Sequence, residues 1–259
     1  MTARTAIVTG STSGIGHGIA TALAASGCNI LLNGFGPAAE IEQIRADLAA
    51  AHGVKVGYSP ADMAKPADIR AMVALAAGEL GGADILVNNA GIQFTATVAD
   101  FPEDKWDAII AINLSAAFHA SKAAIPLMQR AGWGRIVNIA SAHGLVASPN
   151  KAAYVAAKHG IIGLTKVVAL ENANAGITCN AICPGWVLTP LVQKQIDDRA
   201  RLNGTSVEQE KIALLSEKQP MHSFTTPQQL GALAVFLCSD SGATTTGTAV
   251  SMDGGWVAQ

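Results

Sequence analysis

Short runs of β-branched and other apolar residues alternate with longer alanine-rich segments along the whole chain. Several of the short runs are apolar at every position, which is typical of parallel strands that are covered on both faces. Repeated strand–helix units favour a right-handed winding with helices on both sides of the sheet. The pattern therefore predicts an α/β fold built on a doubly wound, seven-stranded parallel sheet. The expected strands are residues 5–10, 28–34, 54–59, 84–91, 135–141, 177–185 and 248–255. The expected helices are residues 15–26, 38–52, 66–80, 104–131, 152–174 and 227–239.

Length and composition indicate a compact globular protein. The 259 residues suffice for one large domain or two small ones, and no Pro/Gly-rich linker divides them, so we expect a single domain over 1–259. Half of the residues are hydrophobic and 14% are charged, which argues against disorder. The net charge is −2 with no basic block, so no nucleic-acid partner is expected.

The apolar runs are interrupted by Gly, Pro, Asn or charged residues, and we expect none to reach the roughly 18 residues of a membrane-spanning helix. The opening "TARTAIVTG" passes directly into a predicted strand and lacks a signal-peptide core. A cytoplasmic protein without a membrane partner is the resulting expectation. Four cysteines in apolar contexts are predicted to be buried free thiols: Cys28, Cys179, Cys183 and Cys238. Neither they nor the six histidines have metal-ligand spacing, so no metal is expected.

One segment departs from the alternation of strands and helices. Residues 186–222 are longer and more polar than a strand–helix connection requires. Segments of this length are usually lids or disordered. We expect a helical lid here.

Glycines follow the first predicted strand and open a helix in the stretch "TGSTSGIGHGIA". Gly10, Gly14 and Gly16 give the spacing GxxxGxG, which allows a tight turn, close approach of the backbone to a pyrophosphate and a helix N-terminus aimed at the anion. Glycine-rich turns are common, but this one lies between a predicted strand and a predicted helix, which favours a dinucleotide-binding site. The intervening Ser11, Thr12 and Ser13 also suit plain helix caps.

The end of the second strand bears on the choice of dinucleotide. An acidic residue there would bind the ribose 2′-hydroxyl of NAD, and a basic one the 2′-phosphate of NADP. The chain has neither, because Asn33 and Phe35 stand in the sequence "NGFG" and Ser13 occupies the turn. The absence of a cation favours NAD.

Further motifs agree with this cofactor and give a family resemblance. "TGSTSGIG", "NNAG" at 88–91, Asn113 in "AINLS", Ser141, "YVAAK" at 154–158 and "PGWVLT" at 184–189 resemble the short-chain dehydrogenase/reductase family from residue 5 to the C-terminal "DGG". The resemblance implies a Rossmann-type fold. It also implies a cofactor site made of Gly10, Ser11, Thr12, Ser13, Gly14, Ile15, Gly16, Phe35, Asp62, Asn89, Ala90, Gly91, Tyr154, Lys158, Pro184, Gly185, Val187 and Thr189.

Tyr154 and Lys158 are four residues apart and share one face of a helix. A free tyrosine has a pKa of about 10, and a neighbouring ammonium together with a cationic nicotinamide favours the phenolate. Tyr154 is therefore the candidate acid/base, with Ser141 placed to hydrogen-bond the substrate oxygen. The family resemblance assigns Lys158 to the nicotinamide ribose and Asn113 to a bend that holds a water in the proton relay. A core tyrosine with an exposed lysine is the plainer alternative, and the other motifs count against it.

A second group of residues bears on the substrate. Gln93, His143, Lys151 and Gln195 resemble the carboxylate-binding set of one branch, the D-3-hydroxybutyrate dehydrogenases. A cationic lysine with three neutral partners suits a small carboxylate, because a charged head is costly to desolvate without partners. In an extended chain His143 points the same way as Ser141. Trp186 and Trp256 would form apolar walls, although each also suits simple core packing.

Alternatives remain within and outside this branch. Another family member, such as a 3-oxoacyl-thioester reductase or a sugar dehydrogenase, would share the catalytic residues. A non-catalytic NAD-binding sensor would keep the fold but has no need of the acid/base pair. The resemblance implies a homotetramer whose interfaces are residues 104–131, 152–174 and the C-terminal strand edge.

Overall fold

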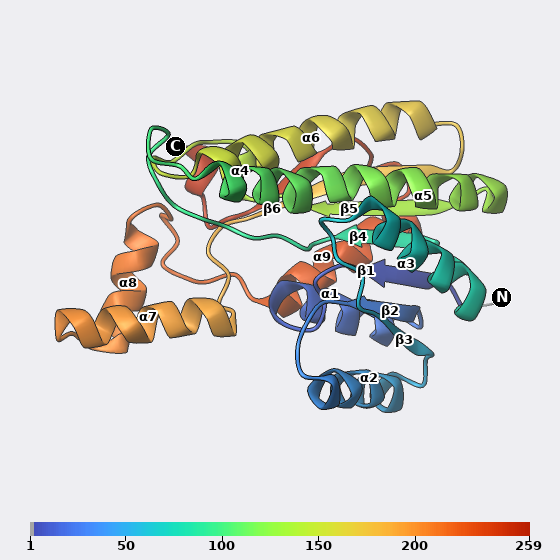
Figure 1. Ribbon diagram of the computed structural model, residues 1–259, viewed down its shortest axis with the longest axis horizontal. Coiled ribbons are helices and arrows are strands. Elements are labelled where there is room, and N and C mark those ends of the chain that lie inside the picture. The colour runs from blue at the N-terminus through green and yellow to red at the C-terminus, as the bar shows by residue number, and fades with distance from the viewer. Residues whose placement is uncertain (1–2) are drawn as a thin grey trace.

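A single seven-stranded sheet organises the chain in the computed structural model, which describes residues 3–259 (Figure 1). The strand order is β3-β2-β1-β4-β5-β6-β7, and every neighbouring pair is parallel. The predicted seven-stranded parallel sheet is confirmed. The strands are β1 (Thr5–Val8), β2 (Asn29–Asn33), β3 (Val56–Ser59), β4 (Ile85–Asn88), β5 (Gly134–Ile139), β6 (Ile177–Pro184) and β7 (Ala249–Met252).

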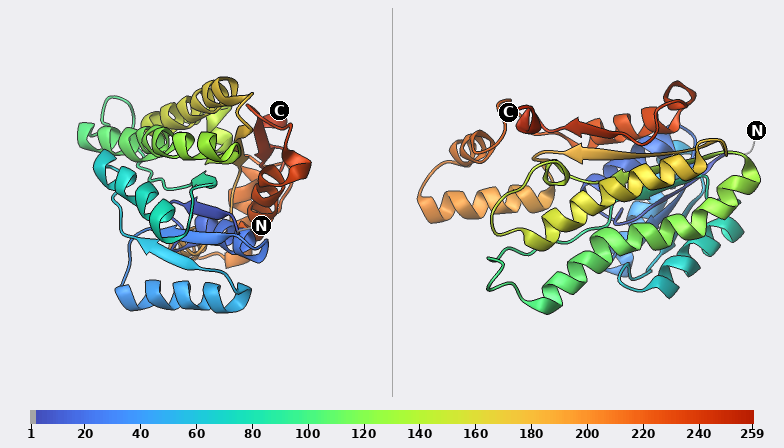
Figure 2. Two further views of the ribbon diagram at one scale, coloured as in Figure 1. Left: turned by 90° about the vertical axis from the view of Figure 1, so that its right-hand side faces the viewer. Right: turned by 90° about the horizontal axis from the view of Figure 1, so that it is seen from above.

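Helices cover both faces of this sheet (Figures 1 and 2). One face carries α1 (Gly14–Ala25), α2 (Ala38–His52) and α9 (Pro227–Cys238). The other carries α3 (Pro66–Glu79), α4 (Glu103–Ile110), α5 (Ala116–Ala131) and α6 (Ala152–Asn172). Successive side chains of a strand alternate between these layers: Ala6 and Val8 pack in the first core and Ile7 in the second. Both faces of the strands are therefore buried, which explains their uninterrupted apolar character.

The strand order places a topological switch point between β1 and β4. The chain runs from β1 outward to β3 and then returns to β4 on the other side of β1. The connections after these two strands consequently diverge and leave a crevice at the carboxyl edge of the sheet, where ligands of open α/β sheets bind.

The predicted helix 104–131 is interrupted near its middle. Residues Ala111–Ser115 form a π-helical turn between α4 and α5. Such a turn accommodates an extra residue and is often found at functional sites. Here it directs the buried Asn113 toward the loop after β4.

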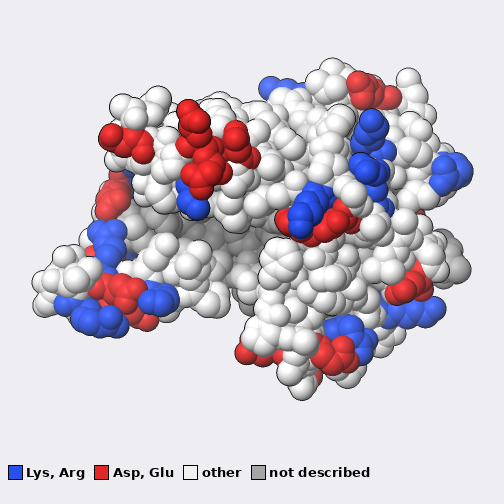
Figure 3. Space-filling model, in the orientation of Figure 1, with Lys and Arg blue, Asp and Glu red and all other residues white. Residues whose placement is uncertain are grey.

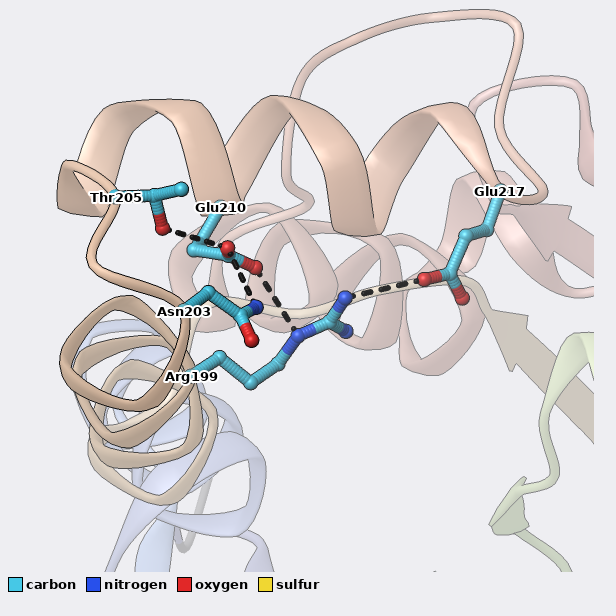
Figure 4. Close-up of polar contacts among 5 residues, drawn as sticks. All are labelled: Arg199, Asn203, Thr205, Glu210 and Glu217. Carbon is cyan, nitrogen blue, oxygen red and sulfur yellow. Dashed lines mark hydrogen bonds and ion pairs between the residues drawn. The ribbon is translucent and has the colours of Figure 1, made fainter.

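The polar segment 186–222 is helical, as expected, and contains α7 (Pro190–Asn203) and α8 (Val207–Ser216). The two helices lie beyond the carboxyl ends of the strands, apart from the sheet layers (Figure 1). Buried Glu210 joins them, because its carboxylate accepts from Arg199 at 3.2 Å, Asn203 at 2.9 Å and Thr205 at 2.7 Å (Figure 4). Arg199 also reaches Glu217 at 3.3 Å, so the pair is held as one unit.

Two of the predicted helical stretches have the length and composition of a membrane-spanning helix. Glu103–Ala131 and Ala152–Asn172 have mean hydropathies of 1.4 and 1.3, within the range of a membrane span. The expectation that no segment reaches this length was wrong. Their alanines, such as Ala120, Ala124 and Ala157, are fully buried within the fold. Burial on the sheet accounts for part of the apolar composition, and core helices of soluble proteins commonly pass the same test.

The cysteines fit the sequence prediction. All four are free and buried. Burial raises the pKa of the Cys179 and Cys238 thiols to about 12, so neither is a ready nucleophile.

Candidate active site

A cleft of about 990 Å³ opens at the carboxyl edge of the sheet, at the switch point. The space-filling view shows the molecule hollowed between the α7–α8 unit and the main body, with most charged side chains on the outer surface (Figure 3). Most of the predicted site residues line this one cleft. They are Gly10, Thr12, Ser13, Gly14, Ile15, Asn89, Ala90, Gly91, Gln93, Ser141, His143, Lys151, Tyr154, Lys158, Pro184, Gly185, Trp186, Val187, Thr189, Gln195 and Trp256.

The glycine turn forms one end of the cleft. Gly10 has a φ of +62°, and a Cβ there would lie 3.0 Å from Ala90 Cα. Gly16 lies inside α1, where a Cβ would overlap the carbonyl oxygen of Gly10. Gly16 therefore supports the turn by close packing and does not line the cleft, and its predicted contact with the cofactor stays a prediction.

Two polar residues near this turn serve the fold. The hydroxyl of Ser11 donates to Val8 O at 2.7 Å and accepts from Asn33 N at 3.0 Å. The Asn33 amide accepts from Gly10 N at 3.2 Å and donates to Ser59 O and Ala61 O at 3.1 and 3.0 Å. Ser11 lies outside the cleft lining, and Asn33 is buried. Both side chains therefore hold strand ends together, and a cofactor contact at Ser11 stays a prediction.

Phe35 and Asp62 also lie outside the cleft lining. Phe35 is 70% exposed just beyond β2, and Thr12 Oγ1 donates to its carbonyl at 3.4 Å. The Asp62 carboxylate accepts from Ala64 N at 2.9 Å and pairs with Lys65 at 3.3 Å. These contacts direct the Asp62 side chain into its own turn.

Asn113 lies behind the cleft in the π-helical turn. Its side chain accepts from Ile92 N at 2.8 Å and donates to Ile92 O at 2.9 Å. It thereby attaches the turn to the loop after β4. The bend expected at Asn113 is present, and its side chain holds that loop through one donated and one accepted hydrogen bond.

Ser141, Tyr154 and Lys158 meet in the middle of the cleft. Ser141 lies two residues beyond the end of β5, and Tyr154 and Lys158 lie one turn apart on α6. Lys158 Nζ lies 5.6 Å from the Tyr154 ring centroid and donates to Ile139 O at 2.7 Å. A phenol, a hydroxyl and an ammonium thus face one space, which suits proton transfer at a bound hydroxyl or carbonyl.

Burial has the largest effect on the pKa values of Tyr154 and Lys158. It raises the pKa of Tyr154, and the hydrogen bond with Ser141 only partly opposes the rise. Burial lowers the pKa of Lys158 to about 8. The expectation that the neighbouring ammonium brings the Tyr154 pKa down is not met by these residues alone, because desolvation outweighs it.

The other end of the cleft combines aromatic rings with one cation. Trp186 and Trp256 are stacked with ring centroids 6.5 Å apart and an interplanar angle of 28°. His143 lies edge-on to Trp256 at 5.0 Å and to Tyr154 at 6.0 Å. Lys151 Nζ lies 5.9 Å from the Trp186 ring. These groups form a short pocket with apolar walls and a cationic edge.

His143 reaches the pocket by a different backbone path from the one expected. It lies in a 3-10 turn, Ala142–Gly144, where its N–H donates to Ser141 Oγ at 3.1 Å. Its Nε2 shares a hydrogen bond of 2.9 Å with Ser148. Burial, with a further contribution from Lys151, lowers the pKa of His143 to about 4. The imidazole is therefore neutral near pH 7.

Lys151 is a half-buried ammonium at the start of α6. Burial and, secondarily, Lys218 lower its pKa. Among the described residues it forms no ion pair, so its charge is open to an anionic ligand. Gln93 and Gln195 are exposed on opposite sides of the same cleft, in the loop after β4 and on α7.

Several lining residues have no sequence motif and were not predicted. They are Ile92, Phe94, Thr95, Ile139, Ala140, Pro190, Leu191 and Val192. All lie within three residues of a predicted site residue, so proximity to the motifs in the sequence was the only available signal. Over residues 3–259 no group of three or more His, Cys, Asp or Glu side chains is arranged to hold a metal ion.

Comparison with known proteins agrees with this geometry. The family model described as enoyl-(acyl carrier protein) reductase matches residues 10–257. The chain is 60% identical to a D-beta-hydroxybutyrate dehydrogenase from Cupriavidus necator, over 99% of this chain and 98% of that protein. It is 57% identical to a D-beta-hydroxybutyrate dehydrogenase from Rhizobium meliloti, over 99% of both. Among solved structures, L-sorbose reductase from Gluconobacter frateurii, complexed with NADPH and L-sorbose, superposes with a TM-score of 0.95 at 30% identity, covering 100% of this chain and 98% of that one.

Proposed function

The chain belongs to the short-chain dehydrogenase/reductase family, and on that premise we propose that it oxidises D-3-hydroxybutyrate to acetoacetate with NAD+. The single observation that carries the substrate is Lys151, a half-buried cation without an ion-pair partner in the described chain, in the same cleft as Ser141 and Tyr154. The names of the two most similar relatives reported above support this assignment.

The groups that line this end of the cleft suit a small hydroxy acid. A carboxylate beside Lys151 would also reach the neutral donors Gln93, His143 and Gln195, so its lost hydration would be replaced by hydrogen bonds. The stacked Trp186 and Trp256 then cover the short carbon chain. A 3-hydroxyl group lies two carbons from the carboxylate, which brings it toward Ser141 and Tyr154.

The cleft also fits a dinucleotide. The missing side chains at Gly10 and Gly14 leave the backbone open beside the first turn of α1, whose N-terminus favours a pyrophosphate. Bound NAD+ would supply the acceptor for the hydride that leaves C3. Lys158 and the Asn89–Gly91 loop would hold its ribose.

The chain's own groups then handle the proton. Ser141 holds the substrate oxygen by a hydrogen bond, and Tyr154 removes the hydroxyl proton as the C3–H bond breaks. Lys158 supplies a positive charge beside the phenol, and its attachment to Ile139 O keeps α6 in place. The positive charge of bound NAD+ would lower the pKa of Tyr154, which favours the phenolate and so opposes the effect of burial.

NAD is the proposed cofactor because no cation stands at the end of β2. Asn33 is buried in contacts within the fold, and Phe35 is exposed but apolar. The L-sorbose reductase neighbour was solved with NADPH, so the fold alone accommodates either dinucleotide. Catalytic efficiency with NAD+ is expected to exceed that with NADP+ at least tenfold, or about 1.4 kcal/mol.

A steady-state panel tests the function as a whole. Purified protein is assayed with NAD+ and NADP+ against the D- and L-forms of 2- and 3-hydroxybutyrate, a 3-hydroxyacyl thioester and a sugar. Turnover centred on D-3-hydroxybutyrate with NAD+ is expected. A preference for the thioester or the sugar would replace the substrate, and no turnover of any member would contradict the enzymatic assignment.

We further propose that the protein assembles as a homotetramer. Apolar side chains stay exposed on the long helices α5 and α6, among them Phe118 (46%), Val167 (51%) and Leu170 (80%). An interface between chains would cover such exposed apolar side chains. Sedimentation should give four chains per particle, and Leu170→Lys should shift it toward smaller species.

A further inference from the structure

Gln219 is a buried amide in an otherwise exposed segment. It follows the end of α8, where its N–H donates to Leu215 O at 2.7 Å. Its neighbours Glu217 and Pro220 are exposed, yet Gln219 itself is only 1% exposed. Polar side chains buried to this degree are normally held by specific partners.

The two ends of this side chain bind different parts of the chain. Oε1 accepts from the backbone N–H of Trp186 at 2.5 Å, just where the chain leaves β6. Nε2 donates to Ser223 O at 3.3 Å, on the return from α8 toward α9. One side chain thereby connects the start and the end of the 186–222 segment.

Two glycines leave the space that the amide occupies. A Cβ on Gly185 would overlap Gln219 Oε1, and a Cβ on Gly254 would lie 2.8 Å from Nε2. Gly254 begins the turn that leads to Trp256, and Met221 N donates to its carbonyl at 2.9 Å. The amide is therefore enclosed by the segments that carry both pocket tryptophans.

We propose that Gln219 is a positioning residue for substrate binding: it fixes the backbone of Trp186 and the turn before Trp256, and so sets the aromatic wall beside Lys151. Trp186 and Trp256 stack on one another, so a shift in either backbone moves both rings. Lys151 Nζ lies over the Trp186 ring, so the same shift displaces the surface beside the ammonium. The identity of the ligand in this pocket rests on the proposed function, whereas the positioning itself does not.

The volume of the side chain alone does not explain why position 219 holds a glutamine. A methionine has nearly the same length but offers no acceptor to the Trp186 N–H, which would stay inside the fold without a partner. A glutamate keeps an acceptor oxygen at that position. The two substitutions therefore separate the hydrogen bond from the filled volume.

The test combines hydrogen exchange with kinetics in the full-length chain. Gln219→Met should speed exchange of the Trp186 amide at least tenfold and raise KM for D-3-hydroxybutyrate at least tenfold. It should leave kcat and KM for NAD+ within threefold of the parent. Gln219→Glu keeps the acceptor for the Trp186 N–H but, when ionised, loses the donor to Ser223 O, so its Trp186 exchange and substrate KM should lie between those of the parent and of Gln219→Met. Gln228→Met is the matched control, because it makes the same change at an exposed glutamine on α9 and should alter neither quantity.

Two results would overturn the proposal. One is a Gln219→Met protein with the parent's Trp186 exchange and KM. The other is a general loss of kcat and of NAD+ affinity with a large fall in Tm, which would mark Gln219 as a plain core residue. The exchange measurement needs no substrate, so faster exchange in a protein that never oxidises D-3-hydroxybutyrate would refute the proposed reaction and leave the role of Gln219 intact.

Discussion

The ammonium of Lys158 donates a 2.7 Å hydrogen bond to the carbonyl oxygen of Ile139, the last residue of β5. This bond attaches α6 to the strand end that leads into Ser141, two residues later. Tyr154, one turn earlier on α6, is thereby fixed relative to Ser141. Elements distant in the sequence are thus held rigidly where the chemistry requires them.

Replacing Tyr154 by phenylalanine removes the transferable proton and keeps the ring. Turnover is expected to fall by roughly 10² to 10⁴, the usual contribution of a general acid/base. NAD+ affinity, measured by calorimetry, should stay close to that of the parent because the ring packing is retained. Turnover within a few-fold of the parent would show that another group transfers the proton.

The low pKa of His143 links folding stability to pH. The folded pKa of His143 is about 4, below the ordinary histidine value of 6.5, because burial and Lys151 disfavour the imidazolium. As pH falls below 6.5 the unfolded chain binds this proton first, so stability decreases until about pH 4 and this contribution then levels off. The loss for this group is up to about 3 kcal/mol, since one pKa unit corresponds to 1.36 kcal/mol.

Urea unfolding at pH 7 and pH 4 measures this effect. The parent should lose more free energy of unfolding over that interval than His143→Gln, which has no titrating group at the position. Equal losses in the two proteins would mean that His143 titrates normally in the folded state.

The α7–α8 unit is expected to close on substrate binding as one body. Glu210 is buried between the helices, and Gln219 fixes the chain at Trp186 and Ser223, so the flexible points lie on the helix side of that contact, in residues 187–189 and 217–218. Hydrogen exchange of these connections should slow when NAD+ and the hydroxy acid are both present. Exchange in 186–222 that is equally slow with and without ligands would argue against a lid.

The sequence predicted the sheet and most of the cleft because both depend on local patterns. Uninterrupted apolar runs identified the strands, and the motifs after β1, β4, β5 and β6 fall at one edge once the strands are parallel. Lys151 and Tyr154 share the start of one helix, so their proximity also followed from spacing.

Details that depend on tertiary contacts were not predictable in this way. In the sequence Asn33 indicated only that no charge stands at the end of β2, but its amide accepts from Gly10 N and donates to Ser59 O and Ala61 O, in two other segments. Gln219 belongs to no motif, and only the folded chain brings it to Trp186. In each case the side chain's hydrogen-bond partner lies more than twenty residues away in the sequence, so no local sequence pattern indicates the contact.

Lys151 is proposed to recognise the carboxylate of D-3-hydroxybutyrate beside Tyr154. Binding energy from this anchor would orient C3 and its hydroxyl for reaction. The most direct measurement compares kcat/KM for the acid and for its methyl ester in the parent and in Lys151→Ala, with NAD+ saturating. Lys151→Ala should reduce kcat/KM for the acid by roughly 10² or more, on the order of 3 kcal/mol. The ester should be a poor substrate of the parent and much less sensitive to the substitution. An ester used as well as the acid, or a Lys151→Ala protein with the parent's kcat/KM for the acid, would contradict the claim.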